Sequence, residues 1–400
     1  MSEQAVIVAA KRTPIGRFLG GLSNVESPQL GAYAVQALFE QAPALRPGGG
    51  VEVDECIMGC VLQAGLGQNP ARQAGLKAGL PDSLSAVTVN KVCGSGLQAV
   101  MLAAQSIRAG DNRCVIAGGF ESMSRAPHFA FLRNGAKFGG LEFKDHMQHD
   151  GLTCAFECWG MTNAADHIAE RYQITREDQD RFSAQSHARA AEAAKNGWFD
   201  AETAALTGEQ VGNRKQPGPE GGVSKDEGVR ADSTAEVLGK LRTVPGHKHI
   251  TAGNASQISD GAAAVCVMSE SRAKDLGLEP LARIVSYHTH GLAPKDIFAA
   301  PIEGIRGALR KAGKTVDDID LFEINEAFSA QVLCNIKELG IDESKLNVCG
   351  GGIALGHPIG ASGARVLVTL LHQMRRLNAK TGLAALCLGG GNAVAMVVER

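Results

Sequence analysis

Aromatic side chains are scarce in this chain of 400 residues, where Phe, Trp and Tyr together make up 4%. A core with so few rings must be built from Ala, Val, Leu and Ile in close-packed layers, with many tight turns among the 49 glycines. An excess of one charge is also missing, because 40 Lys and Arg stand against 42 Asp and Glu. A net charge of −2 provides no broad basic field, so we expect no nucleic-acid partner.

Long apolar runs and paired cysteine motifs are absent as well. The apolar stretch 5–10 is too short for a membrane span or a secretion signal, and neither terminus carries an obvious targeting sequence. The ten cysteines include no CxxC pair and no zinc-like spacing, and we interpret the two Cys-x3-Cys pairs as chance. We therefore expect reduced thiols, a cytoplasmic location, no metal and no membrane association.

The chain is long enough for two or three domain-sized units. Strand and helix patterns alternate through the first 120 residues and again from about residue 250. The stretch 121–250 is richer in charge and reads as an insertion of helices and loops. The predicted organisation is an N-terminal core half (1–120 with 251–275), a loop domain (121–250) and a C-terminal core half (276–400).

Local signals place the individual elements. Cap-and-proline pairs at Ser27-Pro28 and Asn69-Pro70, and a capping box at Thr175-x-x-Asp178, each predict the start of a helix. Further helices are expected after Cys93 as far as Gly110 and over 301–311, 326–339 and 360–373. Strands are expected at 5–10, 55–60, 86–92, 113–119, 262–268, 282–286, 320–324, 346–348, 383–388 and 394–398.

The two ends of the chain resemble each other. The sequence CVIAGG at 114–119 is similar to ALCLGG at 385–390, and each follows a glycine-opened helix that itself follows an apolar strand. Two unrelated α/β halves could match in this way by chance. We interpret the echo as a duplication that gives two α/β halves, with central sheets covered by helices.

Cys93 lies where the extended run 86–92 meets glycines and a long helix pattern. At a helix N-terminus, unpaired amides and the positive end of the helix dipole favour a thiolate over a thiol. Free cysteine has a pKa of about 8.5, so this placement predicts a nucleophile that works at neutral pH. The alternative is a buried cysteine that acts as a small hydrophobe.

Three C-terminal motifs complement Cys93. His357 lies in a glycine-rich loop stiffened by Pro358, where little else could act as a base. Cys387 ends an apolar strand and is followed by three glycines with free amides. Asn325 stands between a strand and a helix, where it could equally well be a helix cap.

The motifs CGSG (93–96), NEAF (325–328), GHPIGASG (356–363) and CLGGG (387–391), in this order, resemble those of the thiolases. The resemblance extends to KRTPIG (11–16), GQNP (67–70), ESMS (121–124) and TAGNAS (251–256), and so covers essentially the whole chain. Within the family, DGLT (150–153) with the following Ala-Phe is most similar to acetyl-CoA acetyltransferases. The resemblance implies an α/β fold of duplicated halves, a layered αβαβα core with a helical and loop insertion.

The resemblance also implies an activity, the condensation of two acetyl-CoA to acetoacetyl-CoA plus CoA, and the reverse thiolysis. Cys93, deprotonated by His357, would become acylated, and Cys387 would take an α-proton from acetyl-CoA. The amides of Cys93 and Gly389 would form one oxyanion hole, and His357 with a water held by Asn325 the other. Coenzyme A thioesters are substrates, and no metal or redox cofactor is implied.

Family positions that contact coenzyme A correspond to Leu152, Met161, Arg230, Ser256 and Phe328. Taken alone, Arg230 would be an ordinary surface arginine; the resemblance assigns its guanidinium to the adenine or phosphate end of the substrate. The segment 124–140 resembles the arm that joins two dimers in acetyl-CoA-type thiolases. The loop domain 121–250 is therefore expected to bind CoA and to make the contacts of a homotetramer, a dimer of dimers.

The sequence departs from the family pattern at three places. Gly160 stands where a histidine is usual, Cys154 replaces an aspartate, and Ile297-Phe298 replaces Met-Gly near the acyl pocket. An inward ring at Phe298 predicts a preference for short acyl chains, whereas Gly160 makes room near the pantetheine.

Several other functions share part of this residue set. The nearest is a broader-range 3-ketoacyl-CoA thiolase of fatty-acid β-oxidation, which differs only in acyl chain length. A ketoacyl synthase would need a histidine in place of Cys387, and a Cys-His acyl hydrolase leaves Cys387 without a role. An inert acyl-CoA carrier would not need the intact set of Cys93, Asn325, His357 and Cys387.

Overall fold

In the computed structural model, residues 3–135, 137–213 and 215–400 are described, and strands from both ends of the chain join in one sheet of ten strands. The sheet runs β10-β11-β12-β9-β1-β8-β5-β3-β4, with β2 beside β8. Its strands are β1 (Ala5–Arg12), β2 (Gly16–Arg17), β3 (Glu55–Gly59), β4 (Ser85–Val89), β5 (Cys114–Ser122), β8 (Ser259–Ser269), β9 (Ala282–Gly291), β10 (Leu321–Ile324), β11 (Thr381–Leu388) and β12 (Asn392–Glu399).

The two halves of this sheet repeat one strand order. In the first half, β4, β3 and β5 are parallel, then β8 and β1 follow with antiparallel pairing. In the second half, β10 and β11 are parallel, then β12 and β9 follow with antiparallel pairing. The halves meet where β1 pairs with β9. This repeated order confirms the duplication that the sequence echo predicted, with one difference: the two expected sheets are continuous.

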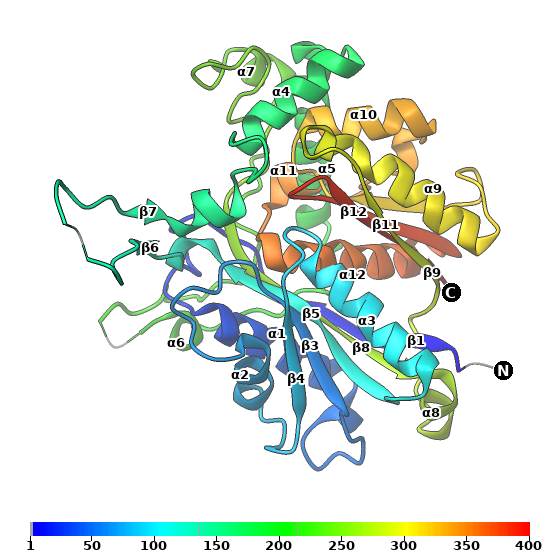
Figure 1. Cartoon of the computed structure of the whole chain (residues 1–400). Coiled ribbons are helices and arrows are strands. Elements are labelled where there is room, and N and C mark those ends of the chain that lie inside the picture. Colours follow the sequence, from blue (N-terminus) through cyan, green and yellow to red (C-terminus); the bar gives the residue numbers. More distant parts are fainter. Residues whose placement is uncertain (1–2, 136, 214) are drawn as a thin grey trace.

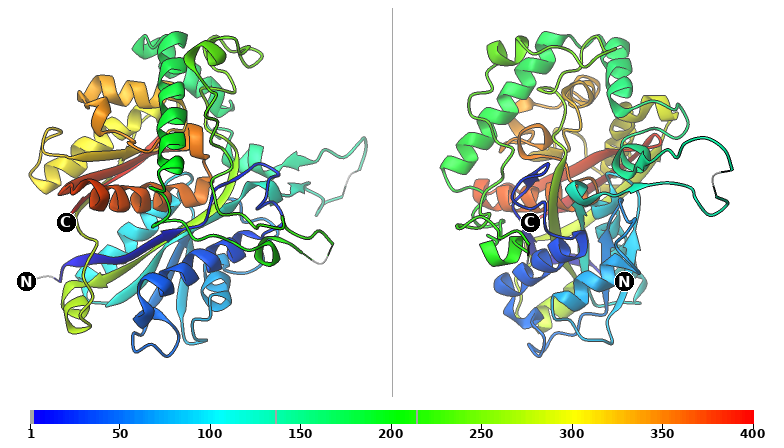
Figure 2. Two further views of the ribbon diagram at one scale, coloured as in Figure 1. Left: turned by 180° about the vertical axis from the view of Figure 1, so that it is seen from behind. Right: turned by 90° about the vertical axis from the view of Figure 1, so that its left-hand side faces the viewer.

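Helices lie on both faces of the sheet and between its halves (Figures 1 and 2). The longer helices are α1 (Ser27–Gln41), α2 (Pro70–Lys77), α3 (Ser95–Ala109), α9 (Ala300–Ala312), α10 (Ser329–Leu339) and α12 (Ile359–Leu377). The first half lies between α1 with α2 and the central pair α3 and α12, and α9 packs on the far face of the second half. This is the layered αβαβα arrangement that the resemblance implied.

The alternation of side chains along β8 shows how the layers are filled. Ala262, Ala264 and Cys266 point into the core under α1, whereas Ala263 and Val265 point into the core around α3 and α12. All eleven residues of β8 are buried, because a strand covered on both faces has no solvated side. Small side chains allow the layers to approach closely, as the low aromatic content predicted.

Most predicted elements are present, and three details of the predictions are wrong. The N-cap residue of α1 is Glu26 rather than the predicted Ser27, and no side chain caps the helix. The Ser27 hydroxyl accepts instead from the amide of Ser122, 2.8 Å away. The helix expected from residue 326 begins only at Ser329. The strand expected at 346–348 is reduced to one bridge, Leu346 with Phe322.

The last difference has a local cause. The Asn347 side chain donates to the Ile324 carbonyl and accepts from the Ile324 amide, both at 2.9 Å. A side-chain amide therefore occupies the edge that a further strand would have paired, and Asn347 itself has a left-handed φ of 45°. The bridge stands in the place that β4 holds in the first half.

The segment 121–250 holds the helices α4 (Met161–Tyr172) and α5 (Arg176–Lys195), the short α6 (Gly208–Val211) and α7 (Ala235–Gly239), and the small ribbon β6 (His128–Phe129) with β7 (Lys144–Asp145). The ribbon belongs to an arm that projects from the body, and α4 lies above the C-terminal half (Figure 1). Within the described residues, no helix is both long and apolar enough to span a membrane. The insertion thus places one helix and one extended arm around the same end of the sheet.

Candidate active site

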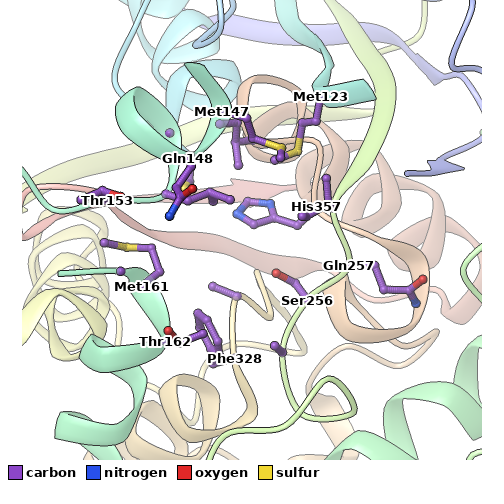
Figure 3. Close-up of a pocket in the computed structure, with 18 of the residues that line it drawn as sticks. Met123, Met147, Gln148, Thr153, Met161, Thr162, Ser256, Gln257, Phe328 and His357 are labelled. Carbon is purple, nitrogen blue, oxygen red and sulfur yellow. The ribbon is translucent and has the colours of Figure 1, made fainter. Parts of the chain in front are cut away.

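A cavity of about 440 Å³ lies where the two halves and the insertion meet. Its wall is mostly apolar, and the His357 ring points into it from one side, with Met161 and Phe328 across from it (Figure 3). The lining residues are Cys93, Met123, Asp145, Met147, Gln148, Gly151, Leu152, Thr153, Gly160, Met161, Thr162, Ala255, Ser256, Gln257, Ile258, Ile297, Phe298, Ala327, Phe328, His357, Ile359 and Cys387. The three residues that the sequence indicated for acid–base or nucleophilic chemistry, Cys93, His357 and Cys387, therefore share one space.

Cys93 and His357 occupy equivalent places in the two halves. Each lies two residues before the first residue of a central helix, α3 and α12 respectively. The two helices cross near their N-termini at glycines: a Cβ on Gly96 would lie 2.7 Å from the Ala364 nitrogen, and one on Gly363 would lie 2.3 Å from the Leu97 nitrogen. Only glycine allows this close approach, and the crossing brings the thiol and the imidazole to one cavity.

The pKa of Cys93 differs from the expectation based on its helix. Val92, just before it, has a left-handed φ of 47°, so a strained turn presents the thiol. Hydrogen bonds from the backbone amides of Gly389 and Cys93 lower the pKa, but burial of the sulfur outweighs them and raises the pKa to about 12. Burial thus opposes the effect of the helix end, and near neutral pH the thiol needs a base.

The hydrogen bonds of His357 fix which ring nitrogen can act as that base. Its Nδ1 lies 2.5 Å from the Ser362 Oγ, and that hydroxyl donates to the Pro358 carbonyl at 2.9 Å. Since the hydroxyl proton is used, Nδ1 must donate to the Ser362 oxygen, which leaves Nε2 unprotonated. Burial, together with the charge of Arg365, lowers the pKa of His357 to about 3. The imidazole is therefore neutral near pH 7, with Nε2 unprotonated.

Asn325 contacts the same imidazole. Its Nδ2 lies 3.4 Å from the His357 Nε2, and its Oδ1 has no hydrogen-bond partner among the described residues. Because α10 begins at Ser329, with Phe328 at its cap position, Asn325 does not cap that helix. The alternative reading of Asn325 as a helix cap is wrong. A buried amide with an unpaired oxygen beside the cavity is suited to binding a polar group there.

Cys387 lies at the end of β11 and is buried. Burial, and then the nearby Cys93, raise the pKa of its thiol well above the ordinary value. The following glycines turn the chain, with φ of 80° at Gly390 and 84° at Gly391. This turn directs the Gly389 amide at the Cys93 sulfur. The strand end thus supplies a second thiol and a hydrogen-bond donor for the first.

Four of the five positions that were expected to bind coenzyme A line the cavity: Leu152, Met161, Ser256 and Phe328. Arg230 does not line it and is exposed. Its backbone amide donates to the His187 Nδ1 at 3.2 Å. The structure brings the four cavity residues together and leaves Arg230 at the surface.

The departures from the family pattern can now be located. Phe298 is buried, lines the cavity and lies 5.3 Å, ring to ring, from Phe328. Gly160 is at the N-cap of α4, and a Cβ there would have no contact closer than 3.5 Å. Cys154 is buried and does not line the cavity. Of the three, Phe298 is the one that reduces the space for a ligand.

Sequence reasoning missed two side chains that position the histidine. One is Ser362, whose only signal was a hydroxyl five residues after His357, in the first turn of a helix. The other is Glu121, at the end of β5, which accepts from the amides of Val61 and Gly360 at 3.0 and 2.9 Å. Burial raises the pKa of Glu121 to about 7, although these amides lower it. A carboxylate thus holds the N-terminus of α12.

Two family models match the chain, "Thiolase, N-terminal domain" over residues 5–271 and "Thiolase, C-terminal domain" over residues 278–400. The acetyl-CoA acetyltransferase of Chromobacterium violaceum is 52% identical over 401 residues, which cover 99% of this chain and 100% of that protein. The enzyme of the same name from Pseudomonas aeruginosa is 50% identical, with 100% of both chains covered. The crystal structure of the Bacillus anthracis acetyl-CoA acetyltransferase matches 100% of this chain and 99% of that one, with a TM-score of 0.93 at 41% identity. The resemblance seen in the motifs is confirmed, and the chain belongs to the thiolase family.

Proposed function

We propose that this thiolase is an acetyl-CoA acetyltransferase, which condenses two acetyl-CoA to acetoacetyl-CoA plus CoA and catalyses the reverse thiolysis. The observation that carries the proposal is the convergence of Cys93, His357 and Cys387 on one largely apolar cavity. The near-full-length similarity to acetyl-CoA acetyltransferases supports the choice of substrate.

In the first half-reaction, His357 Nε2 takes the proton of the Cys93 thiol as the sulfur attacks the thioester carbonyl. The amides of Gly389 and Cys93, which already point at the sulfur, would stabilise the oxyanion. The carbon–sulfur bond to CoA breaks, and the imidazolium returns its proton to the departing CoA thiolate. Cys93 then carries the acetyl group, and no charge remains in the site.

In the second half-reaction, Cys387 acts as the base. Its own proton moves to His357, its thiolate takes an α-proton from a second acetyl-CoA, and the carbanion attacks the acetyl group on Cys93. Asn325 and His357 would hold the thioester oxygen of this substrate, directly or through water. When the Cys93 sulfur leaves, it takes back the proton from His357, so every proton is accounted for.

The substrate would enter past the insertion. Leu152, Met161, Ser256 and Phe328 line the cavity and would contact the pantetheine, and Arg230 would meet the adenine or phosphate end outside. Steady-state thiolysis of acetoacetyl-CoA and of longer 3-ketoacyl-CoAs tests the assignment. A kcat/KM that rises steadily with chain length would favour the broader-range thiolase instead.

We propose that the assembly is a homotetramer and that the enzyme works in the cytoplasm. The arm that contains β6 and β7 exposes large apolar side chains, among them Phe131 (80% exposed) and Phe143 (61%), and such a patch marks a contact surface. Ala136, in the same arm segment 124–140, lies outside the described residues. The ten unpaired cysteines support a reducing compartment. Light scattering at micromolar concentration should give the mass of four chains; a monomer would contradict the proposal.

A further inference from the structure

Two phenyl rings form one wall of the cavity. Phe298 lies in the short turn Pro294–Ala299 that precedes α9, and Phe328 lies at the N-cap of α10. The ring centroids are 5.3 Å apart and the planes are tilted by 56°, so the rings pack against each other. The two residues are far apart in the sequence, and the cavity depends on how the structure holds them together.

Two buried amide side chains on α10 link the backbones behind these rings. Gln331 Oε1 accepts from the Ala327 amide at 3.1 Å, and Gln331 Nε2 donates to Asn335 Oδ1 at 2.9 Å. Asn335 Nδ2 then donates to the Phe298 carbonyl at 3.0 Å. We call Gln331 and Asn335 the amide ladder. It runs from the residue before one ring to the carbonyl of the other.

The two ends of the ladder fix its orientation. A backbone N–H can only donate and a backbone carbonyl can only accept, so neither amide can be flipped without losing both of its bonds. Gln331 and Asn335 are one turn apart on the same face of α10 and are fully buried. Burying amides costs free energy that apolar side chains of similar size would not cost. Core packing alone therefore does not account for two amides here.

The turn that carries Phe298 is held from a second side. Asp296 accepts from His167 Nε2 at 3.0 Å and from Arg171, both on α4. Asp296 thus fixes the start of the turn, and the ladder fixes the position of the Phe298 carbonyl. The position of the Phe298 ring follows from that of its backbone. The wall of the cavity is in this way tied to the helix that presents Phe328.

We infer that the amide ladder, Gln331 and Asn335, positions Phe298 and thereby sets the acyl chain length that the cavity accepts. The inference rests on the proposed thiolase activity and adds two specificity-determining residues that do not touch the substrate. With the ladder intact, the Phe298 ring stays against Phe328 and excludes a longer acyl tail. Without it, the ring can move and the cavity lengthens.

The test compares thiolysis of acetoacetyl-CoA and 3-ketohexanoyl-CoA by the wild type, Asn335→Leu and Gln331→Met. The two variants keep the side-chain volume but remove different hydrogen bonds: Asn335→Leu removes the bond to the Phe298 carbonyl, and Gln331→Met removes the bond to the Ala327 amide. One variant therefore remains informative if the other does not fold. We expect kcat/KM for the six-carbon substrate, relative to the four-carbon one, to rise about tenfold, the discrimination that a methylene or two carries in an apolar pocket. Cys334→Ala is the matched control, since Cys334 is buried on the same helix beside Tyr172, and its ratio should not move.

A double-mutant cycle separates positioning from general loosening. If the ladder acts through the Phe298 ring, Asn335→Leu should change the ratio little in a Phe298→Ala background. An unchanged ratio in the folded single variants, an equal change in Cys334→Ala, or full additivity with Phe298→Ala would overturn the inference and leave the proposed function standing. A wild type that cleaves neither substrate would overturn the proposed function, and the inference with it.

Discussion

The two halves of the molecule share one framework and differ in the chemistry placed on it. Each half has a strand, a glycine-opened central helix and a second apolar strand in the same order. At the equivalent point before the helix, the first half carries the Cys93 thiol and the second carries the His357 imidazole. At the end of the following strand, the first half carries Glu121, and the second, just past Cys387, carries three glycines, of which Gly389 directs its amide at the Cys93 sulfur. The matched positions thus share their geometry and differ in side chain, and in the proposed mechanism they act as nucleophile and base.

Removing the proposed nucleophile of the first half should have the strongest effect on activity. Cys93→Ala should abolish condensation and thiolysis, a loss on the order of 10⁶-fold in kcat, as for other covalent catalysts that lose their nucleophile. The fold should remain, because the change removes only the sulfur atom. Mass spectrometry of the wild type after incubation with acetoacetyl-CoA should find the acetyl group on Cys93; an acetyl group elsewhere would refute the assignment.

Removing the thiol of the second half should have a smaller and more selective effect. Cys387→Ala should still form the acetyl-enzyme on Cys93 but should lose about 10²–10⁴-fold in the proton-transfer step. Deuterium exchange into the methyl group of acetyl-CoA measures that step alone. If exchange in this variant matches the wild type, Cys387 is not the base.

A change in the cavity wall should alter which substrate is preferred, and should leave the chemistry of the thiols in place. Phe298→Gly should relax the preference for acetoacetyl-CoA over six-carbon 3-ketoacyl-CoA by about tenfold, because each buried methylene contributes about 0.8 kcal/mol. Chain-length profiles of kcat/KM measure this, and turnover of acetoacetyl-CoA is the internal control. A variant with an unchanged profile would mean that the ring only fills the core.

A smaller effect is expected on stability. The equivalent groups Cys93 and His357 should change the pH dependence of the free energy of unfolding in opposite senses. The folded pKa of His357, about 3, is below the ordinary value of 6.5, so the unfolded chain binds the proton first. Stability from this group is complete above pH 6.5 and is lost as the pH falls, by up to about 1.4 kcal/mol per pH unit. Urea unfolding at pH 5 and 7 should show a smaller pH dependence for His357→Asn than for the wild type.

Cys93 should behave in the opposite sense. Its folded pKa, about 12, is above the ordinary value of a free thiol, so the folded state keeps the proton longer and stability falls as the pH rises toward 12. Unfolding at pH 8 and 10 should therefore reveal a steeper loss in the wild type than in Cys93→Ala. Equal slopes would mean that folding does not raise the pKa of this thiol.

Much of the fold was predictable because local signals and the core agreed. Asn69 and Thr175 cap their helices with side-chain oxygens as the sequence predicted. The prediction at 346–348 was wrong because a side-chain amide, Asn347, takes the place of a strand at the sheet edge. The short sequence Leu-Asn-Val at 346–348 is compatible both with a strand and with this side-chain pairing.

The candidate site was predictable in its residues but not in its electrostatics. Motif order identified Cys93, His357 and Cys387, but it gave no measure of burial, which outweighs the helix dipole at Cys93. Nor could the glycines at 96 and 363 be recognised as a helix crossing until two helices, far apart in the sequence, were seen in contact. A single sequence does not show which residues far apart along the chain come into contact.

The crossing of α3 and α12 has a consequence for how the protein is made. The inner face of the first half is covered by α12, which packs on β5 and β8, and β1 must wait for β9 to complete its pairing. A nascent chain that has not yet reached residue 359 therefore leaves the ribosome with the inner face of its first-half sheet covered by α3 but not by α12. Such a face is prone to aggregation, and we expect it to recruit chaperones until synthesis is almost complete. The first half of this chain would therefore emerge first but be completed only together with the second half.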